Sequence, residues 1–113
     1  MLVHDPFAML MSVFDERHPG FQYRVRFVPW SVGFFYQKIL GSPVGETLFT
    51  ATGIEIAVSV YLTLADAIEV LAHELAHAVV GANCGHGIKW ETEFTALQEA
   101  YNVAFDRQMM IGA

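Results

Sequence analysis

Residues 63–81 carry two periodic patterns that a helix would bring onto separate faces. One is apolar and has the three- and four-residue spacing of a face packed on a core. Its members are Leu64, Ile68, Leu71, Leu75 and Ala78. Thr63 with Asp66 approximates the capping box that begins a helix, and Gly81 suits the carboxyl end. The segment therefore predicts a helix with one buried face and a second, polar line made of Glu69, His73 and His77.

The polar line contains His73-Glu-Leu-Ala-His77, an H-E-x-x-H pattern. Two histidines four residues apart project from the same face of a helix, so both imidazoles can bind one Zn²⁺ ion. Glu74 points about a third of a turn away, within reach of a water on that metal. The pattern predicts metal-assisted hydrolysis, with His73 and His77 as ligands and Glu74 as the general base.

A catalytic zinc site usually takes three ligands from the protein and leaves a fourth position open. His86 is the expected third ligand, because it follows the end of the helix and is flanked by Gly85 and Gly87, which relax the backbone. Three of the five histidines fall between positions 73 and 86, a clustering that composition does not explain. The alternatives for this third ligand are Cys84, Glu91, Glu93 and Glu99.

Two further helices are expected, one near the start of the chain and one at its end. The first spans residues 5–17, with Asp5 as its N-cap and Pro6 at the first helical position. The second begins near Trp90 and ends near Met109. Its expected buried face is Trp90, Phe94, Leu97, Tyr101 and Phe105, and its expected water-facing side is Glu91, Glu93, Gln98, Asn102 and Asp106. His4 and His18 are expected at the surface.

Three strands are expected between the first two helices. Alternating apolar and polar residues predict a strand at 21–27, and aromatic and β-branched residues predict another at about 32–40. A third is expected over much of 48–62, bent near Gly53. Short connections favour an antiparallel arrangement of the three. The chain thus predicts a single α+β domain, residues 1–113, with a small three-stranded antiparallel sheet.

Composition limits the classes of partner. The 113 residues carry a net charge of −6, which argues against a large nucleic-acid interface, since phosphate binding needs clustered Lys and Arg. The single cysteine, Cys84, excludes an internal disulfide. With no signal peptide and no membrane-spanning segment expected, a cytoplasmic location is the prediction. The 54% apolar content leaves room for a homodimer contact.

The chain resembles a known family at these motifs. His73-Glu-Leu-Ala-His77 followed by His86-Gly-Ile-Lys-Trp90, in the form H-G-x-x-W, is similar to the SprT-like zinc metalloproteases, over about residues 48–105. The resemblance implies a compact zincin fold, with zinc bound by the three histidines and Glu74 as the base. The metzincin and YbeY-type patterns fit less well, because both need a histidine where this chain has Asn83.

These observations predict a zinc metallopeptidase whose substrate is a protein or peptide. The substrate is expected to add a strand to a free edge of the sheet, namely the strand that ends near Leu62. Two alternatives remain from other classes. One is a zinc-stabilised binding module without turnover, and the other is a zinc-dependent nuclease.

Overall fold

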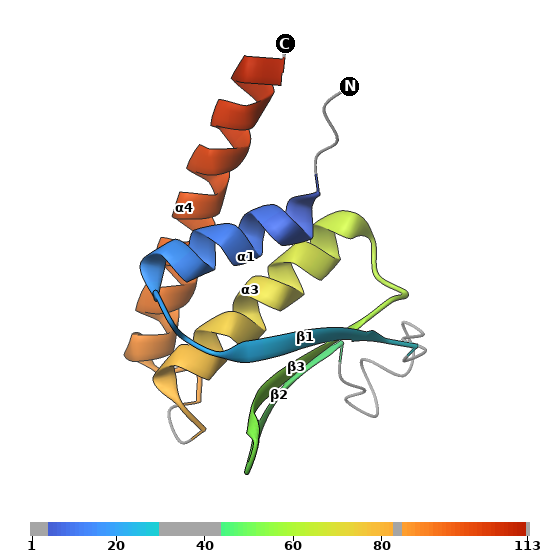
Figure 1. Cartoon of the computed structure of the whole chain (residues 1–113), viewed down its shortest axis with the longest axis vertical. Helices are drawn as coiled ribbons and strands as arrows, with labels where there is room; N and C mark the ends of the chain where they lie inside the picture. The colour runs from blue at the N-terminus through green and yellow to red at the C-terminus, as the bar shows by residue number, and fades with distance from the viewer. Residues whose placement is uncertain (1–4, 30–43, 83–84, 113) are drawn as a thin grey trace.

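The protein is described by a computed structural model, which covers residues 5–29, 44–82 and 85–112 (Figure 1). In chain order the elements are α1 (Pro6–Arg17), β1 (Tyr23–Val28), β2 (Gly45–Thr50), β3 (Gly53–Ser59), α3 (Leu64–Val80) and α4 (Ile88–Gly112). The three helices of these ranges lie on one side of a small three-stranded sheet (Figure 1). Helix α3 packs directly on β2 and β3, and α1 and α4 pack on α3. The α+β class expected from the sequence is confirmed.

Helix α3 has the ends that the sequence predicts. The Thr63 hydroxyl oxygen accepts a hydrogen bond from the Asp66 backbone N–H at 3.2 Å. Gly81 ends the helix at a φ of 97°, a conformation that disfavours a side chain, and its N–H donates to the His77 carbonyl at 3.0 Å. The caps therefore fix where the helix begins and ends.

The sheet is mixed, so the expected antiparallel arrangement is wrong. Strand β3 is central, and it pairs in parallel with β1 and antiparallel with β2. Residues 48–62 do not form one bent strand, because Thr50 pairs with Gly53 across a tight turn that separates β2 from β3. Gly53 has a φ of 136°, which permits this reversal. The strand that runs toward Leu62 is therefore not a free edge.

The cause of this difference is the connection between β1 and β3. Parallel neighbours need a crossover of about a dozen residues or more, and the chain from 29 to 52 provides it. Strand β2, which lies within that connection, pairs on the other side of β3. The strand expected at 32–40 lies outside the described residues.

One hydrophobic core lies between the sheet and the helices. Ile56 and Val58 project from β3 onto α3, and the other fully buried members are Leu10, Phe14, Leu71, Leu75 and Leu97. Leu64 is the exception among the residues expected in the core. It is 55% exposed, because it lies in the first turn of α3 and lines an open pocket between the helices. The core packs α3 between the sheet and the other two helices. This packing fixes the position of the polar line of α3.

Glu93 is buried, although the periodicity of α4 placed it toward water. Its carboxylate accepts two hydrogen bonds from Arg17, at 3.1 and 3.3 Å, and makes a 2.9 Å contact with the Nε2 of His18. His18, expected at the surface, is consequently half-buried. Burial alone would raise the pKa of Glu93, but the bonds from Arg17 and His18 outweigh it and hold that pKa below its usual range. His4 lies outside the described residues.

No helix within the described ranges combines the length and the apolar character needed to cross a membrane.

Candidate metal centre

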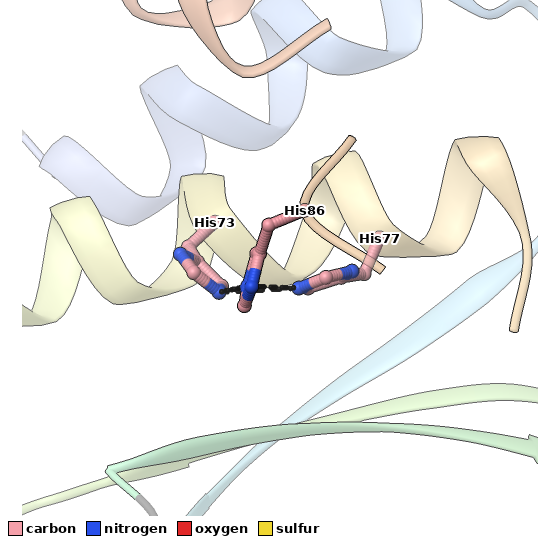
Figure 2. Close-up of side chains that lie close together, drawn as sticks. All are labelled: His73, His77 and His86. Carbon is pink, nitrogen blue, oxygen red and sulfur yellow. Dashed lines mark hydrogen bonds between the residues drawn. The ribbon is translucent and has the colours of Figure 1, made fainter. Parts of the chain in front are cut away.

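Three imidazole rings converge at one point on the surface of α3 (Figure 2). His73 and His77 lie one helical turn apart on the same face, and His86 reaches them from the segment before α4. Gly85, at a φ of 52°, adopts the left-handed conformation that turns the chain back toward α3. The structure thus brings together the three histidines that the sequence identified.

The three Nε2 atoms form a nearly equilateral triangle. His86 Nε2 lies 3.0 Å from the Nε2 of both His73 and His77, and the latter two are 3.2 Å apart. Hydrogen bonds cannot satisfy such a triangle. Each Nε2 of a neutral imidazole carries either a proton or a lone pair, so at least two atoms of the same kind always face each other. A cation bound to all three lone pairs removes that conflict.

The spacing of the nitrogens suits a small divalent ion. Tetrahedral zinc with Zn–N bonds of about 2.05 Å needs nitrogens about 3.3 Å apart. The observed separations of 3.0–3.2 Å come close to that value. Three neutral imidazoles are a donor set that zinc accepts, as do copper, nickel and iron. The described residues therefore hold a site able to bind a metal ion.

The surroundings of the histidines favour the form that binds a metal. Burial lowers the pKa of His73, the charge of His86 lowers it further, and the carboxylate of Glu69 partly opposes both. Burial also lowers the pKa of His77, where Glu74 opposes the shift and the neighbouring histidines add to it. Because only the neutral imidazole is a ligand, protons compete less well with a metal at these two rings.

Trp90 packs against all three rings from the first turns of α4. Its ring centroid lies 4.8 Å from that of His73, 5.5 Å from that of His77 and 4.7 Å from that of His86. On its other side it stacks on Phe94, with centroids 4.9 Å apart and an interplanar angle of 13°. The aromatic pair limits the orientations that the imidazoles can adopt. The periodicity of the sequence predicts Trp90 in the core but does not predict this contact.

Glu74 is held beneath the histidines, with only 8% of its surface exposed. Its Oε1 accepts a hydrogen bond from the Thr47 hydroxyl at 2.7 Å, and its Oε2 lies 3.9 Å from the Nε2 of His73. Burial raises the pKa of Glu74, and the bond from Thr47 partly opposes that shift, as do the charges of the histidines. A carboxylate so placed can accept a proton next to the centre.

Two residues of the site lie on β2 and were missed from the sequence. Thr47 holds the Glu74 carboxylate, and Gly45 lies so close to α3 that a Cβ there would be 3.1 Å from Glu74 Cγ. Thr47 and Glu74 are 27 positions apart. No local pattern carries that signal, because the contact depends on how β2 packs on the helix.

The alternative third ligands do not join the cluster. Glu91 and Glu99 are exposed and lie outside the one group of potential metal ligands that the described residues form. Glu93 is bound to Arg17 and His18 instead. Cys84 lies outside the described residues. Among the candidates that the structure describes, His86 alone completes the site.

A comparison with protein-family models found no match, and searches among curated proteins and solved structures found none either. The geometry of the histidines and Glu74 is therefore the basis for a proposed function.

Proposed function

We propose that this protein is a zinc-dependent metallopeptidase with a zincin-like domain, similar to the SprT-like group. One observation carries the proposal: three imidazoles converge on a point, and a buried carboxylate lies directly beside them. A metal site used only for structure has no need of Glu74 at this position. The H-E-x-x-H spacing supplies the same pairing of ligands and base.

Each residue has a defined task in this reaction. His73, His77 and His86 would hold the ion. Bound zinc supplies a Lewis acid that polarises the scissile carbonyl and makes a water more acidic. Glu74 accepts a proton from the attacking water and returns it to the leaving nitrogen, which is the work of a general base and then a general acid.

Strand β2 is the part of the sheet that suits an extended substrate. Within the described residues β2 is an edge strand, paired only with β3, and Thr47 links it to Glu74. Strand β1 is the other edge, but β3 separates it from β2. We place the substrate backbone along β2, where added main-chain hydrogen bonds would bring a peptide bond to the histidines.

The test combines metal analysis with cleavage of a peptide library. Wild type is expected to bind one equivalent of zinc and to cleave peptides, whereas Glu74→Gln should keep the zinc and lose about 10²–10⁴-fold in kcat. Glu99→Gln is the matched control, because Glu99 is an exposed helical glutamate outside the histidine cluster. It should keep both zinc and activity.

Other results point to other classes of protein. Zinc binding by wild type without any peptide cleavage would favour the binding module. RNA cleavage that His73→Ala abolishes would favour the nuclease. Failure of purified protein to bind zinc at saturating concentration would remove all three functions.

A further inference from the structure

Strand β2 holds Glu74 by a contact that lies outside the H-E-x-x-H pattern. The Thr47 hydroxyl oxygen is 2.7 Å from Glu74 Oε1 and 3.0 Å from the backbone oxygen of Glu74. A hydroxyl has one hydrogen to donate. The carboxylate is both the stronger and the nearer acceptor, at 2.7 Å against 3.0 Å for the backbone oxygen. The hydrogen of Thr47 therefore goes to Oε1.

We propose that Thr47 is a positioning residue that determines which oxygen of Glu74 receives the proton. The proposal rests on the metallopeptidase function proposed above. The two oxygens of a free carboxylate are equivalent, and the terminal torsion of glutamate is broad. With Oε1 bound to Thr47, Oε2 is the oxygen left toward the imidazoles, 3.9 Å from His73 Nε2. The base is thereby oriented before substrate arrives.

Gly45 makes this hydrogen bond possible. It lies two residues before Thr47, so both residues are on the face of β2 that packs against α3. A Cβ at position 45 would collide with Cγ1 of Val70 and would lie 3.3 Å from Oε2 of Glu74. Only glycine lets the strand come this close to the helix. The pair of Gly45 and Thr47 sets the distance and supplies the donor.

The first test separates positioning from folding. Thr47→Val keeps the shape of the side chain but removes the hydroxyl, and Thr47→Ser keeps the hydroxyl. We expect Thr47→Val to lower kcat about 10-fold or more, with KM within about 2-fold and zinc content unchanged, because orientation of the base affects the chemical step. Thr47→Ser should recover kcat to within about 3-fold of wild type, a rescue that a purely structural role would not require.

The second test needs no activity. The urea unfolding midpoints of the zinc-free protein are compared for wild type, Thr47→Val, Glu74→Met and the double variant. Since the two single variants each break the same bond, the loss of midpoint in the double variant should be smaller than the sum of the single losses. Additive losses would show that the hydroxyl and the carboxylate do not interact.

The outcomes distinguish this proposal from the function on which it rests. If wild type cleaves peptides and Thr47→Val has the same kcat, the positioning role is wrong and the metallopeptidase stands. If Thr47→Ser is as slow as Thr47→Val, the hydroxyl is not the active feature and the role is again wrong. If wild type cleaves no peptide, the metallopeptidase function fails, and the positioning role fails with it.

Discussion

The indole N–H of Trp90 donates a hydrogen bond to the backbone carbonyl oxygen of His73 over 3.1 Å. This bond joins the start of α4 to the middle of α3, and the Trp90 ring also lies against the imidazole of His86. The third histidine is thus connected to the first two through a rigid aromatic residue as well as through the chain. The indole thus helps to hold the three donor nitrogens together, which reduces the ordering that metal binding would require.

Trp90→Phe should weaken zinc binding. Phenylalanine keeps an apolar ring but cannot donate to the His73 carbonyl and covers less of the three imidazoles. Changes in the residues that support metal ligands typically cost 10–100-fold in affinity, and we expect about 10-fold here. Competition with a chromophoric chelator measures it. Tyr101→Phe is the matched control, since Tyr101 is on the same helix but its ring contacts Phe105. Equal affinity of wild type and Trp90→Phe would contradict the supporting role.

Zinc should stabilise the fold through all three histidines. A ligand that binds only the native state raises the free energy of unfolding by about 2.7 kcal/mol at 100 times its Kd. The melting temperature of wild type should therefore rise when zinc is added. It should fall back to the zinc-free value when a chelator removes the metal. His86→Ala should remove most of this rise, because it leaves two ligands. His18→Gln should keep it, since His18 contacts Glu93 and lies outside the cluster.

The site was predictable because its signals are local. His73, Glu74 and His77 lie within one and a half turns of a helix whose caps, Thr63 and Gly81, are both visible in the sequence. His86 follows after a short loop. A pattern with a fixed helical period gives the relative directions of such side chains without any knowledge of the tertiary structure.

The pairing of the strands and the contact that holds Glu74 were not predictable in the same way. Alternation identifies the faces of β1 and β3 but not their neighbours, so nothing local indicates that these strands pair in parallel. Glu93 lies at a position of α4 that the helical period predicts to face water. Its burial depends on the guanidinium of Arg17, which belongs to α1. Thr47 likewise meets Glu74 only after β2 packs on α3.

The two leucines Leu75 and Leu64 should differ sharply in what they contribute to stability. Both were expected in the core, but Leu75 is 0% exposed and Leu64 is 55% exposed. Leu75→Ala should lower the free energy of unfolding by about 2–5 kcal/mol through lost burial and a cavity, whereas Leu64→Ala should cost less than about 1 kcal/mol. Urea unfolding of the zinc-free protein measures both. Similar costs would mean that Leu64 is buried in solution.

The pairing of Glu93 should make stability depend on pH. Because Arg17 and His18 hold its pKa below the ordinary value of 4.5, the native state binds this proton less readily than the unfolded state. The stabilisation is then complete well above pH 4.5 and is lost as the pH falls through the lowered pKa. Glu93→Gln should cost about 2 kcal/mol at pH 7, since it removes a charged acceptor from a buried site.

The difference in the free energy of unfolding between wild type and Glu93→Gln should therefore shrink as the pH falls below about 4.5. At that pH the wild-type carboxylate becomes protonated and is then also a neutral group. Urea unfolding at pH 7 and pH 3.5, with a chelator present, isolates this effect from protonation of histidines that hold a metal. Glu91→Gln is the control, since Glu91 is an exposed glutamate on the same helix. The free energy of unfolding of Glu91→Gln should differ little from that of wild type at both values of pH. A cost for Glu93→Gln that stays constant between the two would mean that the carboxylate is stabilised by packing and not by the charge of Arg17.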